Sequence, residues 1–208
     1  MITYTLPTIA RLLNFKSTAS SVPPILYLTD DVRAPNPLPT INKLKTGSGV
    51  IFRHYNIKSR FKLGLKVKKA CQERKLLFLV ARDYSLAHKL NADGLHLPEY
   101  ILLNPSLKIR LWRQRPNKII TASAHCHKSL IKCVALSVDA ALVSPVFPTE
   151  SHPNQTALGI SRFQKLAQKT QIPIYALGGI NNKNAIQLIN SPAIGIAGIS
   201  AISQIQHT

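Results

Sequence analysis

Two glycine-bearing segments near the C-terminal end of the sequence contain the residue types that bind an anion through backbone N–H groups. They are Gly-Gly-Ile-Asn at 178–181 and Gly-Ile-Ser-Ala at 198–201, and each follows a short apolar run. Glycine allows the backbone to approach a phosphate closely, and the N-terminus of a following helix adds its positive end. The alternative interpretation is that these glycines only make tight turns. The pattern predicts a phosphate site if a third loop joins them.

The charge of the chain also favours a phosphate-bearing partner. Among 208 residues, 27 Lys and Arg against 8 Asp and Glu give a formal net charge of +19 and a pI near 10.3. Such a charge attracts nucleic acids, membrane surfaces and small phosphorylated metabolites alike. Aromatic residues are only 6% of the chain, which argues against a nucleic-acid partner. No apolar run approaches the roughly 18 residues of a membrane span, so the predicted partners are small phosphorylated metabolites.

The cysteine pattern indicates a reducing compartment, and we expect a cytoplasmic protein. The three cysteines, Cys71, Cys126 and Cys133, are an odd number without CxxC spacing, which argues against a disulfide framework and a structural zinc site. His125 and His127 flank Cys126, but no third metal ligand is near them in the sequence. No metal site is predicted from these residues.

The elements that must position these loops are short apolar runs separated by stretches with helical spacing. Continuous apolarity is typical of strands that are buried on both faces of a parallel sheet. The predicted strands are 25–28, 49–52, 76–80, 94–97, 118–121, 140–144, 172–176 and 193–196. The predicted helices include 60–74, 83–90, 161–169 and 182–189, of which 83–90 is capped by Asp83. Eight strands in about 180 residues favour an α/β fold, a single compact (β/α)8 TIM barrel, over a doubly wound sheet.

Residues 1–24 differ in composition from the remainder of the chain. They contain no acidic residue, a Ser/Thr cluster at 17–21, and Pro23 and Pro24. A transit-type peptide is one interpretation. We favour a short irregular N-terminal extension that packs against a barrel domain at 25–208. In either case, parallel strands present ligand-binding residues at their carboxyl ends.

Six short motifs, in order along the chain, resemble those of the thiamine phosphate synthase and thiazole tautomerase superfamily. They are Tyr-Leu-Thr-Asp at 27–30, Ala-Asp-Gly-Leu-His-Leu at 92–97, Ser-Ala-His at 123–125, Pro-Val-Phe-Pro-Thr at 145–149, Gly-Gly-Ile at 178–180 and Ile-Ser-Ala-Ile at 199–202. The resemblance covers about 25–204. It implies a (β/α)8 barrel, which agrees with the fold predicted from periodicity.

The resemblance also implies a transferase of thiamine biosynthesis or salvage. The synthase joins a pyrimidine, activated as its diphosphate, to a thiazole phosphate, and it releases diphosphate through a cation-like transition state. The family's thiazole phosphate site is well matched here. Its predicted residues are Thr149, Ser151, Gly178, Gly179, Ile199 and Ser200.

The family's pyrimidine diphosphate side is poorly matched. Of its Gln-x-Arg-x-Lys motif only Arg53 remains, and its Asn-Asp pair aligns with Ala81 and Arg82. The other magnesium ligand aligns with Ile101, so both metal ligands are replaced. Magnesium would bind only if two other carboxylates, those of Asp83 and Glu99, substituted for them.

The residues retained on that side suggest two ways in which the site could work. Ser123 matches the family's serine, and His152 aligns with its lysine. Arg82, with Arg53 and His152, could replace the metal by direct charge. The predicted catalytic residues are therefore Arg53, Ser123, His152 and Arg82, with no metal ligand.

Two alternatives to a working synthase stay open. The chain could be a catalytically degenerate phosphate binder or regulator that retains only the phosphate site. It could also be an isomerase like the thiazole tautomerases, although Pro145 stands where those proteins have a histidine, and His152 would then act as the general acid–base. A homo-oligomer is compatible with any of these interpretations.

Overall fold

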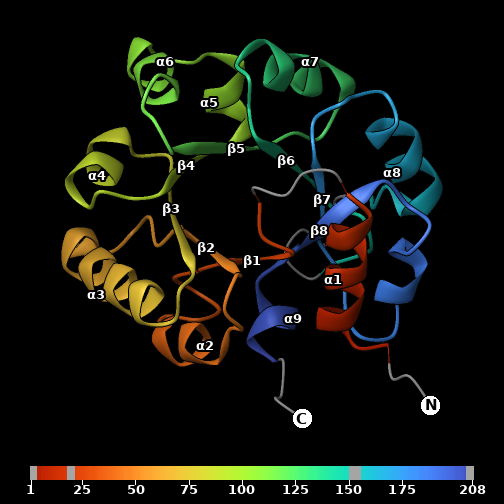
Figure 1. Ribbon diagram of the computed structural model, residues 1–208, viewed down its shortest axis with the longest axis horizontal. Helices are drawn as coiled ribbons and strands as arrows, with labels where there is room; N and C mark the ends of the chain where they lie inside the picture. The colour runs from red at the N-terminus through yellow and green to blue at the C-terminus, as the bar shows by residue number, and fades with distance from the viewer. Residues whose placement is uncertain (1–3, 18–21, 150–155, 205–208) are drawn as a thin grey trace.

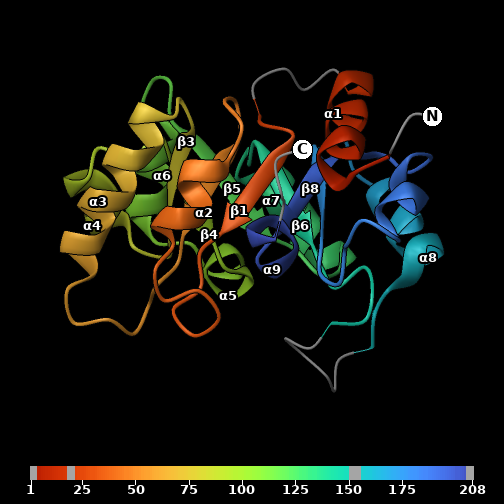
Figure 2. The ribbon, with the colours of Figure 1, turned by 90° about the horizontal axis from the view of Figure 1, so that it is seen from below.

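Eight parallel strands close into a barrel in the computed structural model, which describes residues 4–17, 22–149 and 156–204 (Figures 1 and 2). Each strand pairs with the next in the sequence, and β8 pairs with β1. The strands are β1 (Ile25–Leu28), β2 (Gly49–Phe52), β3 (Leu77–Ala81), β4 (Gly94–Leu97), β5 (Ile119–Ser123), β6 (Ala140–Val143), β7 (Ile174–Leu177) and β8 (Ala193–Gly198). The predicted (β/α)8 barrel is confirmed.

The barrel has two apolar layers because successive strand side chains point to opposite faces. In β1, Leu26 and Leu28 belong to the cluster inside the barrel, whereas Tyr27 belongs to the layer between strands and helices. Both layers are buried along most of each strand, which explains why the strands appear in the sequence as mainly apolar runs, with His96 and Thr121 as buried polar exceptions.

The helices surround the barrel, and within the described part of the chain none is both long and apolar enough to cross a membrane. They are α1 (Leu6–Lys16), α2 (Leu38–Lys43), α3 (Arg60–Glu73), α4 (Tyr84–Lys89), α5 (Glu99–Leu103), α6 (Leu107–Arg113), α7 (His127–Ala135), α8 (Gly159–Ala167), the 3-10 helix η1 (Ala185–Leu188) and α9 (Ser200–Ser203). As predicted, Asp83 caps α4, and its carboxylate accepts a hydrogen bond from the backbone N–H of Leu86 at 2.9 Å.

The N-terminal segment is not irregular, contrary to our expectation, because it contains the helix α1. This helix packs against β8 (Figure 1) and buries Leu6, Ile9, Ala10 and Leu13. The side chain of Asn14 donates hydrogen bonds to two backbone carbonyls, one of which belongs to β8. The apolar stripe therefore gains its partner from the other end of the chain, and α1 covers part of the outer surface of β8.

The helix predicted at 182–189 is shorter than expected. Only Ala185–Leu188 is helical, as the 3-10 helix η1. Asn181 accepts hydrogen bonds from the backbone N–H groups of Lys183 and Asn184 at 2.9 and 3.1 Å. Such local bonds from Asn side chains compete with helix formation, which explains the late start of η1.

Candidate functional site

A cavity of about 350 Å³ lies at the carboxyl ends of the barrel strands. Residues that follow most of the eight strands line it, and these loops lie together on one side of the barrel in Figure 2. This end of a parallel barrel is where ligand-binding residues collect. From β2 to β5, the described lining residues include two arginines and two histidines, namely Arg53, Arg82, His96 and His125.

The wall formed after β1, β2 and β3 contributes three arginines. Arg33 lies in the loop after β1, Arg53 follows β2, and Arg82 follows β3. Arg82 has a φ of 71°, and its backbone N–H donates to the carbonyl of His96 at 2.9 Å. No Asp or Glu is among the described residues that line the cavity. This wall is therefore strongly positive.

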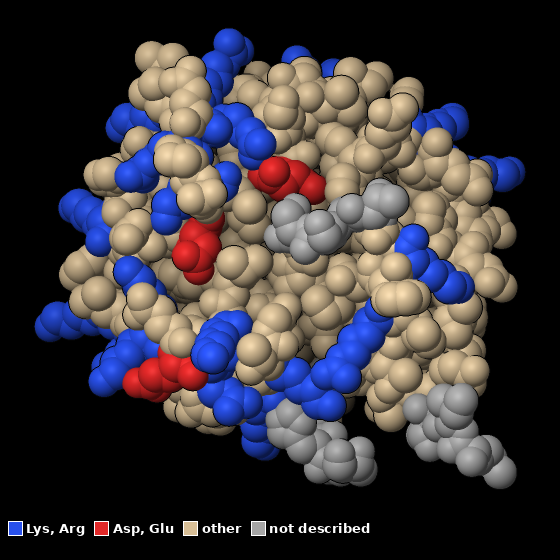
Figure 3. All heavy atoms as spheres, in the orientation of Figure 1, with Lys and Arg blue, Asp and Glu red and all other residues tan. Residues whose placement is uncertain are grey.

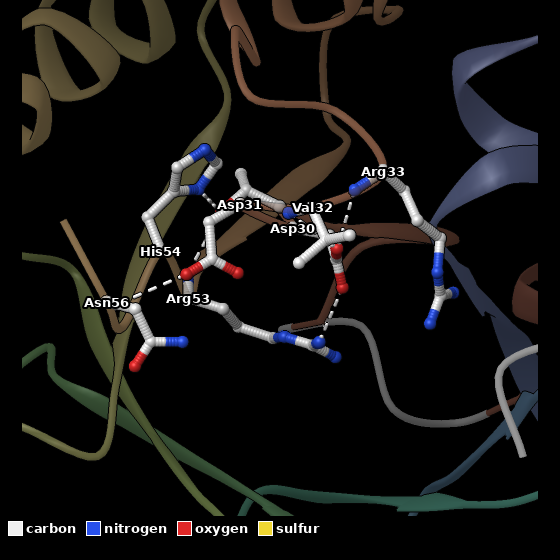
Figure 4. Close-up of polar contacts among 8 residues, drawn as sticks. Asp30, Asp31, Val32, Arg33, Arg53, His54 and Asn56 are labelled. Carbon is white, nitrogen blue, oxygen red and sulfur yellow. Dashed lines mark hydrogen bonds and ion pairs between the residues drawn. The ribbon is translucent and has the colours of Figure 1, made fainter.

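Asp30 connects two of these arginines from beneath the cavity (Figure 4). Its Oδ2 accepts from Nη2 of Arg53 at 2.9 Å, and its Oδ1 accepts from the backbone N–H groups of Val32 and Arg33 at 3.1 and 2.9 Å. Burial alone raises the pKa of Asp30, but these hydrogen bonds and the charges of the two arginines outweigh it and lower the pKa. The carboxylate thus stays ionised and holds the loop after β1 against Arg53.

A second network fixes the backbone where Arg53 follows β2. The backbone N–H of Arg53 donates to Oγ1 of Thr29 at 2.9 Å, and Nδ1 of the buried His54 lies 2.8 Å from the same hydroxyl. Nε2 of His54 donates to the carbonyl of Pro35 at 3.1 Å, because a carbonyl oxygen only accepts. His54 therefore links β2 to the loop after β1.

Tyr55 lies between two guanidinium groups at the edge of the cavity. The guanidinium carbon of Arg82 lies 5.0 Å from its ring centroid, and that of Arg60 lies 5.3 Å from it. Arg60 also donates to the carbonyl of Ala81 at 2.9 Å and pairs with Asp83 at 3.5 Å. Arg60 is thus held by the protein, and the aromatic ring keeps Arg82 beside the cavity.

Histidines and hydroxyls form the wall at β4, β5 and β6. His96 is 3% exposed, with Nδ1 2.9 Å from Oγ1 of Thr121 and Nε2 3.2 Å from Oγ of Ser123. Burial, followed by the charges of Arg53 and His125, lowers the pKa of His96 to about 3, so the ring is neutral. Nδ1 of His125 donates to the carbonyl of Ser144 at 2.9 Å.

The wall formed after β6, β7 and β8 combines backbone and hydroxyl groups. Thr149, Gly178 and Ile199 line the cavity there. Gly178 and Gly179 have φ values of 92° and 66°, and a Cβ on Gly179 would overlap the carbonyl oxygens of the preceding loop. Ser200 is exposed at the start of α9. These glycines are therefore required for the loops after β6 and β7 to pack together.

Comparison with known proteins places the chain in a family. The family model for thiamine monophosphate synthase matches residues 42–202. The chain belongs to that family. The thiamine-phosphate synthase of Oceanobacillus iheyensis is 33% identical over 151 residues, 72% of this chain and 71% of that protein. The thiamine-phosphate synthase of Pyrococcus furiosus is 27% identical over 182 residues, 85% of this chain and 86% of that one.

A solved structure supports the fold in the same way. The thiamine phosphate pyrophosphorylase of Pyrococcus furiosus matches with a TM-score of 0.70 at 22% identity, and the match covers 91% of each chain. At that identity the match shows that the two proteins share the barrel. Membership of the thiamine monophosphate synthase family rests on the family model and on the sequence relatives.

The structure brings together most of the residues predicted for the site. Those that line the cavity are Arg53, Arg82, Ser123, Thr149, Gly178 and Ile199. Gly179 lies behind Gly178 against the loop after β6, and Ser200 is not among the lining residues. Ser151 and His152 lie outside the residues that the structure describes.

Sequence reasoning missed several lining residues, among them Arg33, Tyr55, Tyr100 and His125. The loop of Arg33 and the motif that contains His125 both follow predicted strands, so their position was the signal that could have found them. His96, which the motif at 92–97 contains, is a buried histidine in the barrel. Each ring nitrogen of His96 contacts one hydroxyl, Nδ1 that of Thr121 and Nε2 that of Ser123.

The condition for magnesium is not met in the described part of the chain. Asp83 caps α4 and pairs with Arg60, while Glu99 accepts the backbone N–H of His125 at 2.9 Å. Neither carboxylate lines the cavity, and the described residues contain no group of three His, Cys, Asp or Glu that could hold a metal ion. The side chains present therefore do not fit the family's carboxylate-bound magnesium.

Proposed function

We propose that this protein binds a thiazole phosphate and a pyrimidine diphosphate in the cavity and couples them, within thiamine biosynthesis or salvage. Membership of the thiamine monophosphate synthase family supports this assignment. The observation that carries it is the pairing of two different anion-binding walls in one cavity. Three arginines line the side of β1 to β3, and backbone and hydroxyl donors line the side of β6 to β8.

The thiazole phosphate is assigned to the β6 to β8 side. Thr149 supplies a hydroxyl there, and Gly178 presents its backbone without a side chain. Ile199 lines the cavity where β8 ends, and Ser200 follows it as the first residue of α9. Ser151, which was also predicted for this phosphate, lies outside the described residues. Neutral donors suit a phosphate ester because they bind its oxygens through directed hydrogen bonds.

The pyrimidine diphosphate is assigned to the opposite side, where Arg53 and Ser123 line the cavity. In the coupling, the bond between the methylene carbon of the pyrimidine and the diphosphate oxygen breaks, and its electron pair leaves with the diphosphate. A lone pair of the thiazole nitrogen forms the new C–N bond. No external oxidant or reductant is needed. Groups that stabilise the departing negative charge therefore accelerate this reaction.

The test is a coupling assay on the purified full chain with both substrates, in which thiamine phosphate is detected. The variant Thr149→Val removes one hydroxyl of the proposed thiazole phosphate site and should weaken thiazole phosphate binding about tenfold. The matched control is Thr46→Val, because Thr46 is exposed before β2, away from the cavity. Equal affinities of the two variants would contradict the assignment of Thr149.

The assay also separates the alternatives. Binding of both substrates without product would identify a degenerate binder. Isomerisation of a thiazole phosphate without coupling would identify a tautomerase. The latter would need a proton-transfer group other than Pro145, which lines the cavity but has no proton to exchange.

A further inference from the structure

Among the residues that the structure describes, no Asp or Glu lines the positive wall of the cavity, where a divalent cation would need carboxylates. Asp30, the carboxylate beneath that wall, already accepts from Arg53 and from two backbone N–H groups, and its side chain is 8% exposed. These bonds use three of the roughly four acceptor sites of the carboxylate, and the guanidinium beside Oδ2 repels a divalent cation. The positive charge that would offset a diphosphate must come from the protein itself.

Three guanidinium groups supply that charge from three successive loops. Arg33, Arg53 and Arg82 all line the cavity, and Asp30 neutralises one of the three charges. Guanidinium groups bind phosphate oxygens in pairs of parallel hydrogen bonds and remain charged at any physiological pH. Because Arg53 is 27% exposed at its side chain, it reaches the cavity and keeps its ion pair at the same time.

The guanidinium groups of Arg53 and Arg82 have partners in the protein before a ligand arrives, whereas Arg33 is held through its backbone. Asp30 binds Arg53 through its guanidinium and Arg33 through its backbone nitrogen, as Figure 4 shows. The ring of Tyr55 supports Arg82 on one side, and Arg60 lies against the same ring. Preorganised donors cost little reorganisation when the charge on the leaving group develops.

The remaining basic residues do not form part of this cluster. Lys and Arg side chains are spread along the outside of the molecule in Figure 3, most densely over the side that carries α3 and α4. These are solvated side chains of helix surfaces, whereas the three arginines converge on one cavity from loops that follow different strands. The cluster is therefore distinct from the general basicity of the chain.

We propose that Arg33, Arg53 and Arg82 bind the diphosphate of the second substrate directly and that no divalent cation takes part. This inference rests on the proposed coupling function. A departing diphosphate carries about three negative charges, and the three guanidinium groups, one of which is already balanced by Asp30, offset about two of them. As the C–O bond of the substrate breaks, the electron pair on the leaving oxygen is stabilised by these groups, and no proton has to be transferred.

The test is calorimetric titration of inorganic diphosphate into the full chain, first with EDTA and then with excess Mg²⁺. We expect binding in EDTA and no gain in affinity with Mg²⁺. Arg33→Gln and Arg82→Gln should each weaken binding at least tenfold, because each removes one charged, bidentate donor. The matched control is Arg110→Gln, since Arg110 is exposed on α6 and does not line the cavity. Arg82→Lys, which keeps the charge, should weaken binding less than Arg82→Gln.

Two results would overturn the inference. The first is diphosphate binding that EDTA abolishes and Mg²⁺ restores. The second is an equal loss of affinity in Arg33→Gln, Arg82→Gln and the control Arg110→Gln, which would mean that diphosphate is attracted by the overall positive charge of the protein. The proposed function fails in a different way. If diphosphate binds in EDTA as expected but no thiamine phosphate forms from the two substrates, the arginine site stands and the coupling activity does not.

Discussion

Acidification is expected to destabilise this protein through His96. The pKa of this histidine is lowered from 6.5 to about 3, first by burial and then by the charges of Arg53 and His125. In the unfolded chain the same side chain titrates near 6.5, so unfolding takes up a proton at any pH between these two values. Stability contributed by the neutral ring is therefore present above pH 6.5 and is lost progressively as the pH falls towards 3.

The size of this loss of stability depends on how far the pH lies below the pKa of His96 in the unfolded chain. At about pH 5.0 the unfolded histidine is almost fully protonated and the folded one is not, which lowers the free energy of unfolding by about 2 kcal/mol relative to pH 7.5. Unfolding at about pH 5.0 therefore takes up almost one full proton at His96. The loss is large because the ring is only 3% exposed and both its nitrogens lie within hydrogen-bond distance of hydroxyls, those of Thr121 and Ser123.

The assay is urea unfolding of the wild type and of His96→Gln at several pH values from about 7.5 to 5.0. The variant keeps a polar side chain without a titrating group, so its stability should fall about 2 kcal/mol less than that of the wild type over this range. The control is His127→Gln, since His127 is exposed at the start of α7. If His96→Gln and the wild type lose the same stability, the buried neutral histidine is not the cause and this reasoning is wrong.

Three further perturbations test the packing around the site. Leu13→Ala should lower the free energy of unfolding by about 2–5 kcal/mol in urea, because Leu13 is 1% exposed between α1 and the barrel. Asp139→Asn should cost about 1–3 kcal/mol in the same assay, since one oxygen of Asp139 accepts from both Arg113 and the backbone N–H of Ile120, at 2.6 and 2.7 Å. Gly179→Ala should displace the loop after β6 and weaken thiazole phosphate binding in titrations, and unchanged affinity would contradict the proposed contact between the loops after β6 and β7.

Much of the barrel was predictable from local sequence. The apolar runs at β1, β2 and β4 predicted the observed strand bounds, because strands buried on both faces consist mainly of apolar side chains. The cap of α4 was equally local, since Asp83 bonds within its own turn. Predictions of this kind succeed where the deciding interaction lies within a few residues.

The N-terminal helix shows where such predictions stop. The apolar stripe of α1 is stable because β8, some 180 positions further along the chain, provides the surface that covers it. The side chain of Asn14 in α1 also donates a hydrogen bond to the backbone carbonyl of Ile194 in β8. The local sequence of α1 therefore contains the apolar stripe but does not show which surface covers it.

The candidate site was likewise only partly predictable from the sequence. The sequence by itself predicted a basic, thiamine monophosphate synthase-like barrel in which the family's magnesium ligands are replaced and glycine loops follow β7 and β8. Only the tertiary structure decided that Arg33 lines the same cavity as Arg53 and Arg82, and that Glu99 turns to the backbone of His125 instead. Barrel closure brings loops from different strands to one cavity, and the direction in which each side chain points there depends on partners that are distant in the sequence.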